Sequence, residues 1–236
     1  MKPTRICTSS VIGVETYMPP SDLDATAVLA PQGEWHERQS VAAAFPSVPV
    51  LPGTLLGLEL LVQRPAFDLR AASYLIGEDP GALLHLFALA GEEYGSAGEG
   101  PVRLEECIAS LSSQHLLRAL ATAGGARREQ AQFADFARHG SAVGRCAQLV
   151  ADSLDLSREE ALLVGMLHEL GTLPSLLGWT SPLPFETGSV LWCRELGRRY
   201  KLPAELRSAL DAVHGKLAGS VWVAVIDAAH DLLRTV

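Results

Sequence analysis

The chain has 236 residues, of which 48% are hydrophobic and 6% aromatic, and its 19 basic and 27 acidic side chains give a net charge of −8. This length is enough to bury a substantial core in one large domain or two small ones, while the lack of a long basic run argues against sequence-independent binding of nucleic acid. No uninterrupted run of 18 apolar residues and no signal-peptide pattern occurs, which predicts a cytoplasmic protein outside the membrane.

Residues 1–46 contain repeated prolines among Ser, Thr and Asp, a composition that is typical of irregular chain. We expect a partly irregular N-terminal extension with at most one short helix, near residues 23–29. From Val48 onward the composition changes to long apolar stretches rich in Ala and Leu, which favour packed helices over a sandwich or barrel.

A first set of helices is predicted between residues 47 and 126. Asp68 is a candidate N-cap, and Asp79 followed by Pro80 combines a cap with a first-turn proline. The predicted helices span residues 55–62, 69–76, 80–89, 104–109 and 115–123.

A second set is predicted after the break at Gly124 and Gly125. Its first helix carries a stripe of apolar residues to which His139 belongs, so His139 is expected to face inward. No strand alternation of useful length is present, and the chain therefore predicts an all-α domain at 47–236 with helical lobes at about 47–126 and 127–236. The predicted helices span residues 130–150, 157–170, 186–200, 203–214 and 220–233.

The helix that begins at Ser157 is apolar nearly all round and ends in the pair His168-Glu169. Ser157 and Glu160 have the spacing of a capping box, and Gly171 has the position of a left-handed helix stop. An all-round apolar helix is usually buried. A charged group at its end then needs a hydrogen-bonding partner, a proton or a metal ion.

Several helices of the second set contribute candidate metal ligands. Asp227 is the only ionisable residue between Val221 and Ala229, so we expect a buried carboxylate, and His230 follows three residues later on roughly the same face. Imidazoles and carboxylates that converge from separate helices can hold a divalent ion that activates water. The order of these residues suggests a phosphoester hydrolase, with a satisfied core polar pair as the alternative. The candidates are His139, His168, Glu169, His214 and Asp227.

Four segments of the chain, in order and separation, resemble the HDOD family, a group of output-type relatives of the HD-domain phosphohydrolases. The resemblance extends from Val48 to about His230. It implies an HD-like helical bundle packed against a smaller N-terminal helical lobe. The four segments are Val48–Pro52, Leu75–Pro80, Leu104–Ala109 and Leu167–Gly171.

The same resemblance implies that catalysis is absent. Competent HD enzymes carry a His-Asp pair, whereas this chain has His168-Glu169. The extra methylene of Glu shifts its oxygens by about 1.5 Å, which is large against a tolerance of about 0.2 Å in a metal–ligand distance. Relatives that cleave cyclic dinucleotides carry a lysine shortly after the pair, and Thr172 stands there instead. We therefore expect no catalytic residue, no cofactor and only a vestigial metal site.

The resemblance implies a bacterial signalling domain that acts through a protein partner, at partner-binding residues that the sequence does not identify. The alternative is a divalent-metal-dependent phosphohydrolase or phosphodiesterase acting on a nucleotide or cyclic dinucleotide. A third hypothesis is ligand binding without turnover in the old metal pocket. Neither nucleic acid nor a membrane is expected as a partner.

Overall fold

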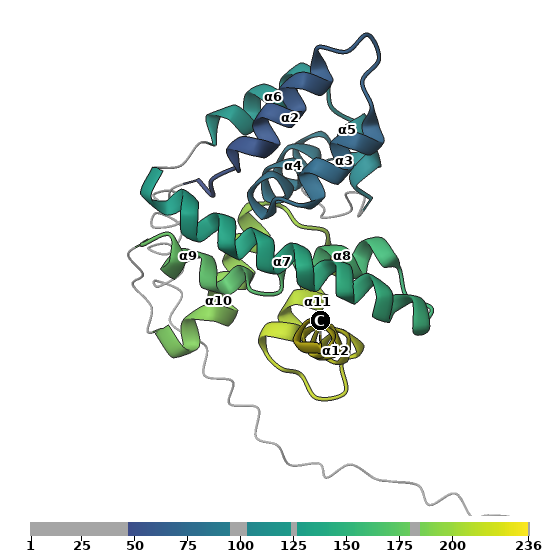
Figure 1. Ribbon diagram of the computed structural model, residues 1–236. Coiled ribbons are helices and arrows are strands. Elements are labelled where there is room, and N and C mark those ends of the chain that lie inside the picture. Colours follow the sequence, from purple (N-terminus) through teal and green to yellow (C-terminus); the bar gives the residue numbers. More distant parts are fainter. Residues whose placement is uncertain (1–46, 95–102, 124–126, 180–184, 236) are drawn as a thin grey trace, which may run out of the picture. The chain divides into compact units, whose positions relative to one another are not determined.

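The computed structural model describes residues 47–94, 103–123, 127–179 and 185–235 (Figure 1). In these ranges all regular structure is helical, which confirms the predicted all-α class. The predicted extension at 1–46, with its short helix at 23–29, lies outside the described residues. None of the helices in the described ranges has the length and apolarity required to cross a membrane.

The first helical set begins and ends close to the predicted residues. Asp68 caps α3 by accepting a hydrogen bond from the Ala71 N–H, and Ser112 caps α6 by accepting one from the His115 N–H. Within the set, α2 contacts α3 and α6, and α4 contacts α3, α5 and α6. The helices are α2 (Pro52–Val62), α3 (Leu69–Gly77), α4 (Pro80–Glu93), α5 (Leu104–Ala109) and α6 (Ser113–Thr122).

Asp79 joins the start of α4 to the segment that precedes α2. Its fully buried carboxylate accepts hydrogen bonds from the N–H groups of Gly81 and Ala82 through Oδ1, and from that of Leu51 through Oδ2. The backbone approaches closely here, because a Cβ at Gly81 would lie 1.8 Å from the Pro49 carbonyl oxygen. One carboxylate therefore caps a helix and fixes the incoming chain.

The second helical set follows the predicted order, with a short additional turn after the central helix. Ser157 caps α8 by accepting a hydrogen bond from the Glu160 N–H, as predicted. The elements are α7 (Arg127–Ser153), α8 (Arg158–Leu167), the 3-10 helix η1 (Leu170–Thr172), α9 (Leu173–Leu176), α10 (Phe185–Arg199), α11 (Ala204–His214) and α12 (Val221–Thr235).

The helix α8 contacts both sets. Its C-terminal part packs along α7, and it also contacts α11 and α12 (Figure 1). Near its N-terminus, Glu159 Oε1 accepts a hydrogen bond of 2.7 Å from the backbone N–H of Leu104 at the start of α5, and α8 also contacts α3. Burial from several sides explains why every residue of α8 from Ala161 to Leu167 is apolar, after a charged first turn.

Three glycines bring α7 and α8 unusually close. A Cβ at Gly165 would lie 2.5 Å from the Gly144 Cα, and one at Gly144 would lie 2.8 Å from the Leu162 carbonyl oxygen. A Cβ at Gly140 would lie 2.6 Å from the carbonyl oxygen of Met166. Backbone therefore meets backbone along this helix pair, and no larger side chain fits at these positions.

The expectation that Gly171 is a left-handed helix stop is wrong. The helix α8 ends at His168 in a right-handed conformation, and Gly171 lies within η1. Glycine is needed at position 171 for a different reason, since a Cβ there would lie 2.0 Å from the Ser189 carbonyl oxygen of α10. Of the described glycines, Gly178 after α9 and Gly219 before α12 have a positive φ, +67° and +80°.

We predict that Gly165→Ala lowers the free energy of unfolding by about 2–3 kcal/mol, because the new methyl group must push α7 away from α8. The matched control is Gly53→Ala in α2, where a Cβ would meet nothing within 4 Å. That control should be neutral or should stabilise the protein by up to about 1 kcal/mol, because alanine favours helix. Urea unfolding of both variants tests this, and equal midpoints would contradict the close contact.

Candidate functional site

The helices α7, α8 and α12 bring three imidazoles together. One ligand nitrogen from each of His139, His168 and His230 lies within 4.8 Å of the other two. The ring of His168 is 5.2 Å from that of His139 and 4.9 Å from that of His230, measured between centroids. The rings of His139 and His230 are stacked at 5.5 Å. We call this group the histidine cluster.

His168 is the buried member of the histidine cluster, with a side chain that is 5% exposed. Its Nδ1 lies 2.7 Å from the Gly165 carbonyl oxygen, and because a carbonyl only accepts, Nδ1 carries the proton. Nε2 therefore has the free lone pair, and this buried atom has no hydrogen-bond partner among the described residues. Burial, followed by the neighbouring imidazoles, lowers the pKa of His168 to about 4, so the ring is neutral at pH 7.

Glu169 lies on the open side of the histidine cluster, with a side chain that is 44% exposed. Its Oε2 is 3.9 Å from Nε2 of His139, and its Oε1 is 4.0 Å from Nε2 of His168. These separations are too long for hydrogen bonds. The carboxylate therefore lies beside both imidazoles without a direct hydrogen bond to either.

Among the predicted candidates, the structure brings His139, His168 and Glu169 together and leaves His214 to one side. His214 is half-buried, and its Nε2 is buried without a hydrogen-bond partner in the described part of the chain. Burial lowers its pKa, and the nearby Asp211 opposes that shift. His214 acts electrostatically on His168, but its nitrogens are not among those that converge.

The expectation that Asp227 is a buried carboxylate is wrong. Its side chain is exposed, because α12 is amphipathic: Val225, Ile226 and Ala229 face the core while Asp227 lies on the outer face with Asp231. Asp227 therefore does not belong to the histidine cluster.

His230 occupies the place that the sequence assigned to Asp227. It follows Ile226 by four residues and Ala229 by one, so it lies at the edge of the buried face of α12 and is half-buried. The signal that could have identified it was its position beside this apolar stripe. The sequence showed that Asp227 and His230 lie near one another but not which of them turns inward.

The donors of the histidine cluster fit a divalent metal ion. Neutral imidazole suits Zn²⁺, Cu²⁺, Ni²⁺ and Fe²⁺, while a carboxylate adds charge compensation. A histidine ligand usually donates its other ring N–H to a carbonyl or carboxylate, which fixes the tautomer. His168 has this arrangement through the Gly165 carbonyl. A metal there would act as a Lewis acid or as a structural link.

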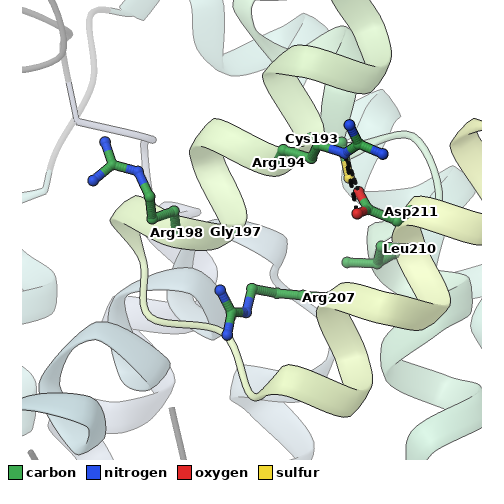
Figure 2. Close-up of a pocket in the computed structure, with 7 residues that line it drawn as sticks. All are labelled: Cys193, Arg194, Gly197, Arg198, Arg207, Leu210 and Asp211. Atoms are coloured by element: carbon green, nitrogen blue, oxygen red, sulfur yellow. Dashed lines mark hydrogen bonds and ion pairs between the residues drawn. The ribbon is translucent and has the colours of Figure 1, made fainter. Parts of the chain in front are cut away.

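A pocket of about 230 Å³ lies apart from the histidine cluster, between α10 and α11 (Figure 2). Two of its three arginines are ion-paired, since Arg194 Nε donates to both oxygens of Asp211 and Arg198 donates to Glu195. The third, Arg207, has a buried Nε without a hydrogen-bond partner among the described residues. Burial raises the pKa of the adjoining Cys193 thiol to about 12, so it is not a nucleophile at neutral pH. The histidine cluster is therefore the stronger candidate site.

Comparison with known proteins finds a matching family model and a similar solved structure. The model of the HDOD domain family matches residues 48–178. Among solved structures, a fragment (residues 20–298) of the MmoQ response regulator from Methylococcus capsulatus str. Bath is similar, with a TM-score of 0.54 and 18% identity over 78% of this chain and 83% of that one. This likeness is one of fold. No curated protein sequence matches the chain.

The family match contains His139, His168 and Glu169 but ends before α10. His230 therefore lies outside the matched region.

We predict that the free energy of unfolding falls as the pH of the metal-free protein drops from about 6.5 to about 4. The unfolded chain takes up a proton on His168 near pH 6.5, whereas the folded chain does so only near pH 4. Stability is therefore lost across this window, by about 3 kcal/mol from this residue.

The substitution His168→Asn should reduce the dependence of the free energy of unfolding on pH between 6.5 and 4. The asparagine amide can still donate a hydrogen bond, but it does not titrate. His115→Asn, at an exposed histidine, is the control and should keep the slope. Urea unfolding at a series of pH values with a chelator measures both variants. Identical slopes for the wild type and His168→Asn would contradict the assignment.

Proposed function

The chain belongs to the HDOD domain family, and on this premise we propose that it is a regulatory domain of bacterial signal transduction that acts by binding a protein partner and not by catalysis. A fold by itself does not establish an activity. The proposal therefore depends on particular side chains of this chain.

The observation that carries the proposal is the outward position of Asp227. The sequence pattern of a phosphoester hydrolase needs a carboxylate from the last helix, and the exposed Asp227 does not supply one to the histidine cluster. The acidic member of the central pair is the longer Glu169, and its side chain is 44% exposed. The described residues around the cluster thus lack two features that the hydrolase pattern calls for.

A groove between α2 and α3 supports contact with a protein. It has a volume of about 550 Å³ and contains Leu60 and Tyr74, which are 55% and 61% exposed. Charged side chains at its edge include Arg64, Asp68 and Arg70. Exposed apolar side chains with a polar rim are typical of protein interfaces.

The second candidate function is a divalent-metal-dependent phosphohydrolase, and the specific observation in its favour is the histidine cluster. Three imidazoles that hold an ion can lower the pKa of a bound water and create a nucleophile. In that case His139, His168 and His230 would be ligands, and Glu169 would be the group available to accept a proton.

Turnover assays separate the two candidates. We predict no release of phosphate or nucleotide from p-nitrophenyl phosphate or a cyclic dinucleotide when the purified chain is supplied with Mn²⁺ or Zn²⁺. His168→Asn is the matched control for contaminating hydrolases, and it should give the same background as the wild type. Hydrolysis by the wild type that disappears in His168→Asn would overturn the regulatory proposal and support the hydrolase.

A cross-linking experiment tests the partner contact. Cross-linking in lysate of the source organism, followed by mass spectrometry, identifies a partner whose affinity is then measured with purified proteins. We predict that Leu60→Glu weakens this affinity by at least about tenfold, because a charge must be desolvated at the apolar groove. Leu149→Glu, at a leucine of α7 that is 61% exposed, is the matched control and should leave the affinity unchanged. Equal weakening by both variants, or by neither, would contradict the groove as the contact surface.

A further inference from the structure

The three imidazoles come from three different helices, and one of them, His230, lies outside the part of the chain that the family model matches. We propose that His139, His168 and His230 bind one divalent transition-metal ion of the zinc type, with Glu169 as a fourth donor, and that this ion fastens α12 to α7 and α8. The proposal goes beyond the regulatory function and does not depend on it.

The first step of the argument is the unpartnered atom. Nε2 of His168 belongs to a side chain that is only 5% exposed, faces Glu169, and has no hydrogen-bond partner among the described residues. A buried polar atom without a partner costs about 1–3 kcal/mol. An ion in the space beside it removes that cost, because the lone pair becomes a metal bond.

The second step is orientation. The Gly165 carbonyl accepts the proton of Nδ1 at 2.7 Å and holds the ring of His168 with Nε2 toward the other imidazoles. The rings of His139 and His230 lie at 5.2 and 4.9 Å from this ring. His168 is therefore a metal donor whose ring orientation is already fixed, whereas the half-buried rings of His139 and His230 can adjust their positions.

The third step is the size of the space. Zinc–nitrogen bonds of about 2.0–2.1 Å at tetrahedral angles place neighbouring donors roughly 3.3 Å apart. The donor nitrogens here lie within 4.8 Å, and the carboxylate oxygens of Glu169 lie 3.9 and 4.0 Å from Nε2 of His139 and of His168. The three nitrogens must therefore approach one another by up to roughly 1.5 Å, while Glu169, which is not in the group within 4.8 Å, reaches the ion by rotation of its side chain. His139 and Glu169 have room for these movements, because their side chains are 41% and 44% exposed.

The fourth step is the class of ion. Imidazoles are borderline ligands, which bind Zn²⁺, Ni²⁺, Co²⁺ and Cu²⁺ in preference to Mg²⁺ or Ca²⁺. One carboxylate supplies a single negative charge, and the hard cations usually take sets of oxygen ligands. Tetrahedral coordination by three imidazoles and one carboxylate is complete without water, so the geometry suits a structural ion.

Zinc alone is the probe in the test, with protein that carries no histidine tag. We expect about one Zn²⁺ per chain after dialysis against a metal-free buffer, and a higher thermal unfolding midpoint when zinc is present, because the ion binds only the folded chain. Co²⁺ should bind competitively and give visible absorption bands of tetrahedral coordination. Mg²⁺ at the same concentration should leave the unfolding midpoint unchanged.

The variants locate the ion. His139→Ala and His230→Ala should each weaken zinc binding by at least roughly 100-fold and abolish the thermal shift. His115→Ala, at an exposed histidine of α6, is the matched control and should retain both. Circular dichroism of the metal-free variants checks that they fold. A measurement that needs no variant is NMR of the wild type with Co²⁺, which should shift the ring signals of the histidine cluster and leave those of His115 in place.

Less than one-tenth of an equivalent of bound zinc would overturn the inference, as would unchanged affinity in both alanine variants. Equal or tighter binding of Mg²⁺ would overturn the zinc-type preference. Zinc binding without hydrolysis supports both this inference and the regulatory function. Hydrolysis that depends on the same histidines overturns the regulatory function alone. Failure of the zinc site and failure of the regulatory function therefore give different results.

Discussion

The close contact of α7 with α8 is the constraint on which the rest of the second helical set depends. At Gly144 and Gly165 the two backbones meet with no side chain between them. His139 directly precedes Gly140 on α7, and His168 follows Gly165 by one helical turn on α8, so the same contact sets the distance between the two rings. Gly165 has two roles, because its missing side chain admits α7 while its carbonyl accepts the proton of the His168 ring. Gly165 therefore determines both the contact between α7 and α8 and the orientation of the His168 ring.

The histidine cluster follows from the way α12 is added to this pair. The buried face of α12 meets α7 and α8, and the residue at the edge of that face is His230. Burial, followed by the neighbouring imidazoles, lowers the pKa of His168, so the fold favours the neutral form of this ring. The charge of Glu169 is the local compensation that the described residues provide. The cluster is therefore one buried, neutral imidazole with two half-buried imidazoles and one carboxylate beside it.

Local signals predicted most of the fold. Asp68, Asp79 and Ser157 each accept the backbone hydrogen bonds that a cap should accept, because a cap depends only on residues two or three positions away. Gly171 misled the prediction because a left-handed φ and a close approach both demand glycine, and only the position of Ser189 distinguishes them. At the candidate site, the sequence correctly indicated His139 and His168, but the prediction that Asp227 is buried there was wrong. His230 borders the buried face of α12 formed by Val225, Ile226 and Ala229, whereas Asp227 lies on the outer face, and the neighbouring helices decide which face is buried. The domain and lobe boundaries stay predictions.

The hydrogen bond from Leu104 to Glu159 has a mechanical consequence for α8. The helix has ten residues, which corresponds to a rod of about 15 Å. One end holds the start of α5, and the other end carries His168. Between these two ends α8 packs against α7, α11 and α12, so one short helix connects the start of α5 to the histidine cluster. The contact with α5 and the position of His168 are therefore both fixed by the same helix.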